Sequence, residues 1–368
     1  MLSFIKSKQA CTGCGACQAV CPTECITLDI DEEGFWYPNA GSACIDCGRC
    51  EEVCPIVNRV PVDDTKQYCV AGRHNNTDVW LASTSGGAFS AICQAFENPA
   101  IAIFGAKHLD KSNVIHDFVT NINDIDCFRK SKYSQSNMSG NYCSIRRFLE
   151  EGRRVIFSGT PCQVAGVRNF LNKDYDNLLC IDLICHGVGS PGIFDKYINY
   201  LEGANDSEVV SFEFRSKRIV KGLLNQNITR TRFVDGRILE NKNDIFYQAF
   251  IQALILRPSC GECIFAKTDR VGDLTIGDLN NMQAFLPESD KCVNYSTIIV
   301  NTEKGDTIMK KLNEYMDLYP VDLDAIAKYN SALISSTQMN QKRADLFVDL
   351  RHGYPINEVL EKYITEVS

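Results

Sequence analysis

The sequence predicts a mixed α+β or α/β protein in which a small cysteine-rich domain precedes a larger body. A cysteine motif occurs twice within residues 1–60, and beyond it short apolar strands alternate with amphipathic helices. Of the 368 residues, 45% are hydrophobic and 23% are charged, as in ordinary globular proteins. We expect the cysteine-rich domain at 1–62, the body at 67–320 and a helical C-terminal extension at 321–368.

The chain contains 19 cysteines and has a net charge of −8. A disulfide-built secreted protein would be short and would begin with a signal peptide, which the opening Met-Leu-Ser-Phe-Ile-Lys does not resemble. The longest apolar stretch, near 245–256, is too short and too polar to cross a bilayer. We therefore expect a cytoplasmic protein with reduced, metal-binding thiols, no membrane span and no nucleic-acid partner.

The cysteine motif of the first domain reads C-x2-C-x2-C-x3-C-P and recurs 33 residues later, at 10–22 and 43–55. This is the run of a bacterial two-cluster ferredoxin, in which the fourth cysteine ligates the other cluster. Zinc knuckles are disfavoured, because zinc sites use two close ligand pairs. The predicted ligands are Cys11, Cys14, Cys17 and Cys54 for one 4Fe–4S cluster, and Cys44, Cys47, Cys50 and Cys21 for the other.

The elements of the body follow from apolar periodicity and turn signals. Strands are expected at 68–72, 100–104, 114–120, 154–158, 178–184, 209–215, 274–277 and 297–301, with a hairpin across Asp235-Gly236. Helices are expected at 84–97, 139–151 and 244–256. One further helix is expected to begin at 163 and another to end at about 201, and the last sixty residues are expected to be helical.

Four further cysteines, Cys162, Cys185, Cys260 and Cys263, stand in loops next to these elements. Strand C-termini in α/β folds converge on one crevice, so these thiols can form a third 4Fe–4S site. Zinc binding, or separate redox and packing roles, are the alternatives. Free cysteine often behaves as a small buried hydrophobe. That role is expected for Cys25, Cys69, Cys93, Cys127, Cys143, Cys180 and Cys292.

A flavin is the usual converter between the single electrons of an iron–sulfur cluster and a two-electron substrate. No G-x-G-x-x-G follows a predicted strand, which disfavours a Rossmann site. Thr84-Ser-Gly-Gly at a helix start is either a phosphate cradle or a simple cap. Lys132-Tyr-Ser-Gln-Ser suits a phosphate or an isoalloxazine edge, or is an ordinary polar loop.

Seven segments, matching in order, together resemble the β subunit of coenzyme F-420-reducing hydrogenase and related dehydrogenases: 85–89, 131–136, 157–166, 182–191, 257–266, 273–278 and 300–305. The resemblance implies FAD beside a 4Fe–4S cluster in the body. It places Ser85, Gly86, Gly87, Lys132, Tyr133, Gln135 and Ser136 along the FAD, and position at the same crevice adds Thr160, His186 and Gly187. The segment 277–282 lacks the aromatic pair and glycine common in the family, so specificity for the deazaflavin does not transfer automatically.

We therefore expect an iron–sulfur flavoprotein oxidoreductase of anaerobic metabolism. It would pass single electrons between 4Fe–4S clusters and FAD, and two electrons or a hydride between FAD and a substrate such as coenzyme F-420 or another small molecule. Lys132 would offset negative charge, and His186 is a candidate proton donor or a hydrogen-bonding neighbour of Cys185. The alternative is a non-catalytic electron-transfer subunit of a larger redox complex. Expected partners are ferredoxin or another redox protein, the small-molecule substrate, and a second copy or other subunits.

Overall fold

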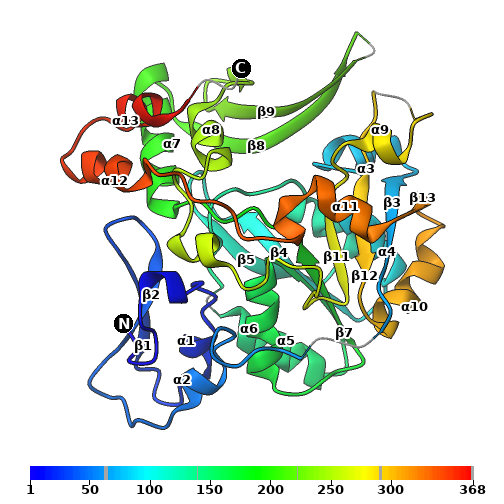
Figure 1. The fold of residues 1–368 in the computed structure, drawn as a ribbon, viewed down its shortest axis with the longest axis horizontal. Coiled ribbons are helices and arrows are strands. Elements are labelled where there is room, and N and C mark those ends of the chain that lie inside the picture. The colour runs from blue at the N-terminus through cyan, green and yellow to red at the C-terminus, as the bar shows by residue number, and fades with distance from the viewer. Residues whose placement is uncertain (62–64, 139, 222, 290–291, 366–368) are drawn as a thin grey trace.

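A mixed sheet of eight strands forms the centre of the protein, in the order β13-β3-β12-β11-β7-β6-β4-β5 (Figure 1). The computed structural model describes residues 1–61, 65–138, 140–221, 223–289 and 292–365. The pairings between β11, β7, β6 and β4 are parallel, and the flanking pairings are antiparallel. The strands are β3 (Tyr68–His74), β4 (Ile101–His108), β5 (Val114–Val119), β6 (Arg154–Gly159), β7 (Leu178–Leu183), β11 (Leu274–Asp278), β12 (Ser296–Val300) and β13 (Met316–Val321).

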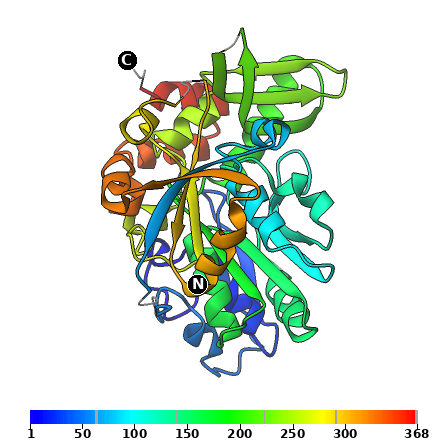
Figure 2. The same ribbon diagram turned by 90° about the vertical axis from the view of Figure 1, so that its right-hand side faces the viewer.

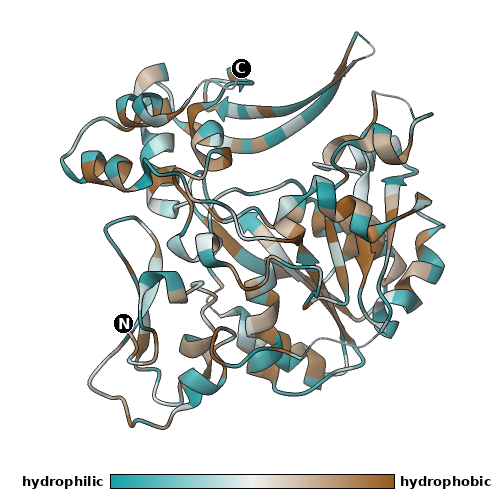
Figure 3. Cartoon of the chain, viewed as in Figure 1, coloured by the Kyte–Doolittle hydropathy of each residue, from teal (hydrophilic) through white to brown (hydrophobic). Residues whose placement is uncertain are grey.

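Helices cover both faces of this sheet because its parallel strands are apolar on both sides. Ala102 and Phe104 pack with α5 (Asn141–Glu150) and α6 (Pro161–Leu171). The alternate residues Ile101 and Ile103 pack with α4 (Ala88–Ala95) and α10 (Glu303–Leu312). Figure 3 shows hydrophobic residues along the central strands of the sheet. The expected mixed α/β body is confirmed.

A second apolar core lies beside the sheet and unites segments that are distant in sequence. It contains Phe194, Phe214, Phe250, Phe347 and Leu360, all buried. Above it, three antiparallel strands form an arm that projects from the molecule in both views (Figures 1 and 2). The elements are α7 (Pro191–Asn205), β8 (Val209–Val220), β9 (Leu223–Phe233), β10 (Ile238–Asn241), α8 (Ile245–Ile251), α12 (Arg343–Arg351) and α13 (Ile356–Tyr363).

The N-terminal cysteine-rich module packs against the body beside α6 (Figure 1). Gly15 and Gly48 adopt positive φ angles of 83° and 75° immediately before its two helices, which an L side chain rarely tolerates. At the tip of its hairpin, Arg343 Nη1 donates to Glu33 Oε1 at 3.0 Å, so the module contacts the C-terminal helices. The module contains η1 (Lys8–Ala10), α1 (Ala16–Val20), β1 (Ile26–Ile30), β2 (Trp36–Ala40) and α2 (Arg49–Glu52).

Two expectations about secondary structure differ from the structure, and some helices were not expected. The helix expected at 244–256 ends at Ile251, because Ala253 adopts a positive φ of 56°. The last sixty residues are not wholly helical, since β13 pairs antiparallel with β3. The helix α3 (Thr77–Ala82) was not expected. Residue 139, part of an expected helix, and residues 62–64, next to the expected domain boundary, lie outside the described residues. The remaining elements are η2 (Ile122–Phe128), η3 (Pro258–Glu262), α9 (Met282–Phe285), α11 (Leu323–Tyr329) and η4 (Ser331–Leu333).

We predict that Gly86→Ala destabilises the fold by about 2–4 kcal/mol, because the added methyl group would overpack the interior. Its Cβ would lie 2.1 Å from the carbonyl oxygen of Gly72 and 2.4 Å from the amide nitrogen of Ser296. Urea denaturation measures the loss. The matched control is Gly203→Ala in α7, where the Cβ would meet nothing within 4 Å. This control should gain about 0.5–1 kcal/mol of stability, and equal effects at both positions would contradict the prediction.

Candidate functional site

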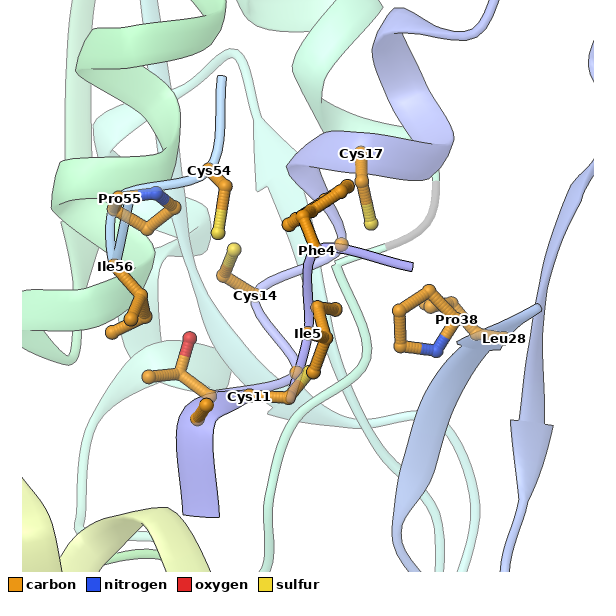
Figure 4. A pocket seen from close by; sticks show the side chains of 14 residues that line it. Phe4, Ile5, Cys11, Cys14, Cys17, Leu28, Pro38, Cys54, Pro55 and Ile56 are labelled. Carbon is orange, nitrogen blue, oxygen red and sulfur yellow. The ribbon is translucent and has the colours of Figure 1, made fainter. Parts of the chain in front are cut away.

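Four cysteines of the module surround one pocket, which we call the inner thiol set: Cys11, Cys14, Cys17 and Cys54 (Figure 4). Three come from the first motif, and Cys54 comes from the end of the second. In Figure 4 the sulfur atoms of Cys14 and Cys54 face one another. Phe4, Ile5 and Ile56 line the same pocket and make it apolar. The exchange of the fourth cysteine between motifs is therefore the arrangement that the spacing predicts.

The outer thiol set consists of Cys21, Cys44, Cys47 and Cys50. Cys21 and Cys50 pack in one apolar cluster with Ile26, whereas Cys44 and Cys47 are exposed. Cys25 lies beside this set, with its Sγ 3.5 Å from that of Cys21. The outer set is thus the part of the module that is open to solvent.

The structure also brings together Cys162, Cys185, Cys260 and Cys263, which we call the body thiol set. Cys162 follows β6 and Cys185 follows β7, so the parallel pairing of these strands places both at one edge of the sheet. Cys260 lies within η3, and Cys263 ends it. The charges of the other three thiols all act to raise the pKa of Cys185, which places the four groups close together.

Burial dominates the electrostatics of the inner and body sets. It raises the pKa of Cys14 and of Cys162 to about 12 and that of Cys260 to about 11, and neighbouring thiolates add to the effect. The bare thiols are therefore protonated at neutral pH, and a metal that binds them must displace protons. Within the described residues, no three His, Cys, Asp or Glu side chains are arranged around a single ion. A 4Fe–4S cluster has a different requirement, because its four thiolates bind four separate iron atoms and need not surround one point.

The inner and body sets are neighbours across the contact between module and body. Cys14 and Cys162 belong to one apolar cluster, and their charges interact. Gly166 lies one turn beyond Cys162 in α6. A Cβ added to Gly166 would lie 3.3 Å from Cys14 Sγ. Tyr142 Oη donates to the carbonyl oxygen of Cys14 at 2.7 Å. The order of the sets is outer, inner, body.

The residues predicted to line FAD fall into two groups. In the first, Ser85 Oγ donates to the carbonyl oxygen of Tyr295 at 2.8 Å, and Tyr133 stacks on Phe250 with ring centroids 4.3 Å apart. His186 meets the edge of the same Phe250 ring at 5.3 Å. Gly87 begins α4 with a positive φ of 93°. These residues lie at the C-terminal ends of the parallel strands. Gly187, which follows His186, has a φ of 149°.

The second group bonds to the protein itself. Lys132 Nζ donates to the carbonyl oxygens of Cys127 and Arg129, at 3.1 and 2.6 Å, and burial lowers its pKa to about 7. Gln135 Nε2 donates to the carbonyl oxygen of Thr12, at 3.0 Å, so this side chain faces the module. Thr160 Oγ1 lies 3.2 Å from Cys162 Sγ, beside the body set.

Sequence reasoning missed two cations on β8. Arg215 Nη1 donates to Asp278 Oδ2 at 2.6 Å and to Tyr133 Oη at 3.3 Å. Lys217 Nζ donates to the carbonyl oxygen of Ser85 at 2.7 Å, and burial lowers its pKa to about 7. No local signal marks these residues, because the fold of the β8–β9 arm brings them to the Ser85 turn.

The donor set around Ser85 and Tyr133 fits an anionic, aromatic ligand such as a flavin nucleotide. Lys217 supplies positive charge when it is protonated, and Arg215 supplies a guanidinium that is already paired with Asp278. Tyr133 supplies an aromatic ring packed on Phe250. The Oγ of Ser134 is buried and has no hydrogen-bond partner among the residues described here. Such a hydroxyl calls for a partner from a ligand or water.

Comparison with known proteins bears on the body and on the iron–sulfur module. Residues 152–325 match the family model for the C terminus of the beta subunit of coenzyme F420 hydrogenase/dehydrogenase. The match covers a little under half of the chain, so the body is similar to that family over this region. Residues 10–58 match the 4Fe-4S dicluster domain, so the module is an iron–sulfur domain of the two-cluster type.

Two relatives place the β-subunit family in context. The F subunit of the F(420)H(2) dehydrogenase of Methanosarcina mazei is 24% identical over 227 residues, which cover 55% of this chain and 61%, less than two thirds, of the relative. A chain of the F420-reducing (NiFe) hydrogenase complex from Methanosarcina barkeri is 17% identical, with a TM-score of 0.49, and the match covers 81% of this chain and 97% of that one. Among the described residues, no helix is long and apolar enough to cross a membrane.

A buried histidine supports the loop that carries Gln135. His116 Nδ1 accepts a hydrogen bond from Ser136 Oγ at 2.8 Å, and its Nε2 lies 3.1 Å from the carbonyl oxygen of Ser158. Gln163 Nε2 donates to the same Ser136 Oγ at 3.0 Å. Burial lowers the pKa of His116 to about 4, and the nearby charge of Lys132 lowers it further. The neutral ring is therefore the native form.

We predict that this histidine makes the fold less stable in mild acid. The unfolded chain binds a proton at the ordinary pKa of about 6.5, whereas native His116 does not, so stability falls as the pH drops from 6.5 toward 4. Between pH 7.5 and 5.5 the loss is about 1 kcal/mol. Urea denaturation at both pH values should show this loss reduced in His116→Gln and unchanged in the exposed control His352→Gln. An unchanged pH dependence in His116→Gln would contradict the prediction.

Proposed function

We propose that this protein is an iron–sulfur flavoprotein oxidoreductase with three 4Fe–4S clusters and one FAD. The inner and outer thiol sets hold the two clusters of the module, and the body set holds the third. The substrate is a small two-electron carrier such as coenzyme F420. When bound, the clusters exchange single electrons and FAD pairs them.

The observation that carries the proposal is the meeting of the body thiol set beside the inner set. Cys162, Cys185 and Cys260 come from separate segments, yet their charges act on one another. The charge of Cys162 also acts to raise the pKa of Cys14, which belongs to the module. Four packing cysteines would have no reason to gather at the C-terminal edge of parallel strands and beside a dicluster domain.

The protein's own residues have distinct roles in this proposal. Lys217 and Arg215 bind the anionic part of the flavin nucleotide, and Tyr133 packs against its ring system. The Ser85–Gly87 turn offers backbone N–H groups at the start of α4. His186 is the proposed proton donor, because it lies at the same aromatic cluster as Tyr133. Lys132 offsets negative charge from its half-buried loop.

A second candidate function is electron relay within a larger redox complex, with the substrate bound by another subunit. The exposure of Cys44 and Cys47 favours it, because a cluster at the surface can exchange electrons with another protein. Turnover of the isolated chain with reduced ferredoxin and a small-molecule acceptor separates the two functions. Activity supports the enzyme, and a chain that is reduced but does not turn over supports the relay.

We predict that the full chain, purified anaerobically, binds about twelve iron atoms, four for each cluster. Cys185→Ser should lower the content to about eight, because the body set loses one ligand. The control is Cys180→Ser in β7, the strand that precedes Cys185. Cys180 is buried and lies outside the three sets, so this variant should keep about twelve irons. Iron analysis and electron paramagnetic resonance check both. Eight irons in the unmodified chain would exclude the third cluster, and no loss in Cys185→Ser would exclude Cys185 as its ligand.

We also predict that the chain releases FAD on acid denaturation and that Lys217→Met weakens FAD binding about tenfold, which is about 1.4 kcal/mol. The reason is the loss of a buried cation beside the Ser85 turn. Fluorescence titration of the flavin-depleted protein measures the affinity. Lys111→Met, which removes a lysine paired with Glu202 on the surface, is the control and should bind FAD normally. A chain without flavin would exclude this part of the proposed function.

A further inference from the structure

A buried guanidinium lies between the inner and body thiol sets. The side chain of Arg257 is 0% exposed. Its Nε donates to the carbonyl oxygen of Cys11 at 2.8 Å, and its Nη2 donates to that of Trp36 at 3.0 Å. Its Nη1 donates to Gln135 Oε1 at 3.0 Å, and the ring of Tyr37 lies 4.2 Å from its Cζ.

The partners of Arg257 are all neutral, which distinguishes it from Arg270, a second buried arginine, which pairs with Asp182. The half-buried Arg168 and Arg343 likewise pair with Asp273 and Glu33. Within the described part of the chain, no Asp or Glu forms an ion pair with Arg257. A buried charge without an opposite charge is strongly destabilising, by several kcal/mol. The position of Arg257 therefore calls for a negative charge from another source.

The two neighbouring ligand sets supply that charge when they are loaded, because each cluster is held by four thiolates. The guanidinium bonds to the carbonyl of Cys11, an inner-set residue. The backbone of Arg257 is joined to the body set, since the N–H of Cys260 donates to its carbonyl at 2.9 Å. Its charge also acts to lower the pKa of the Cys162 and Cys260 thiols, against the effect of burial.

We propose that Arg257 is a positioning residue that raises the reduction potentials of the inner and body clusters above that of the outer cluster. Reduction adds one electron to a cluster, and a nearby cation in a buried site stabilises the reduced form more than the oxidised form. This inference rests on the proposed function. It assigns a direction to the chain of clusters, because electrons then favour the body side.

The surroundings of the outer set favour the same direction. Cys44 Sγ lies 3.6 Å from Asp46 Oδ1, and Glu51 and Glu52 stand on the adjacent helix α2. Negative charge beside a cluster disfavours the added electron, so the outer potential should be the lowest. The outer cluster is therefore an internal reference for the effect of Arg257.

The test is a redox titration, followed by electron paramagnetic resonance, of the full chain loaded anaerobically. Arg257→Met removes the charge, and Arg257→Lys keeps it. At a fixed solution potential, the ratio of reduced to oxidised inner and body clusters should fall at least tenfold in Arg257→Met, which is a shift of 59 mV for a one-electron couple. In Arg257→Lys the ratio of reduced to oxidised clusters should stay close to that of the unmodified chain. The outer cluster should not change.

A second pair of variants tests the charge with Arg257 in place. Gln135→Glu sets a carboxylate beside the guanidinium and should lower the same two potentials, whereas Gln135→Leu removes the amide bonds without adding charge. Arg146→Met is the matched arginine control, because Arg146 also joins a carbonyl and a ring, those of Phe170. If Arg257→Met fails to load iron, the inference is tested by the difference in the inner and body reduction potentials between Gln135→Glu and Gln135→Leu.

Two results would overturn the inference: unchanged inner and body potentials in Arg257→Met and Gln135→Glu, or an equal shift of all three clusters. Either would leave Arg257 as a docking residue only. A failure of the proposed function looks different, since the unmodified chain would then lack the third cluster or the flavin. In that case the inner cluster still reports the effect of Arg257, because the module is a dicluster domain.

Discussion

The binding of one backbone loop by the body is the contact on which the arrangement of the sites depends. Three nearby carbonyls of the loop, those of Cys11, Thr12 and Cys14, accept hydrogen bonds from Arg257, Gln135 and Tyr142 of the body. Buried carbonyls need such partners, because water cannot reach them. A Cβ at Gly13 would lie 2.7 Å from Gln135 Nε2 and 2.9 Å from Arg257 Cζ, so a side chain there would displace the groups that hold the loop. The positive φ of 67° also favours glycine at this position.

The parallel strands at the centre of the sheet position the body thiols, which lie on the other side of this contact. Because β6 and β7 run side by side, the residues that follow them meet at one edge, and Cys162 and Cys185 occupy that edge. The short helix η3 adds Cys260 and Cys263 from a segment that also carries Arg257. A scaffold of rigid strands thus sets the body thiols against a loop from a different domain.

The grouping of the cysteines could be predicted from the sequence, whereas their role as cluster ligands stays a prediction. The repeated motif has fixed spacing, and cysteines after apolar strands can be placed by the convergence of strand ends. The sequence could not predict Arg215 and Lys217, since their role depends on how the β8–β9 arm folds over the Ser85 turn. Gln135 was expected beside the flavin, yet its amide reaches Thr12. Which way a side chain of a polar loop points is decided by tertiary packing, which periodicity does not contain.

The ion pair between Glu33 and Arg343 has a consequence for biosynthesis. Its partners are 310 residues apart, and Arg343 lies close to the last helix. Glu33 therefore leaves the ribosome 310 residues before Arg343, and this docking contact cannot form in the interval. The hairpin of the module thus gains its last partner only after the chain has been made as far as the helix that begins at Arg343.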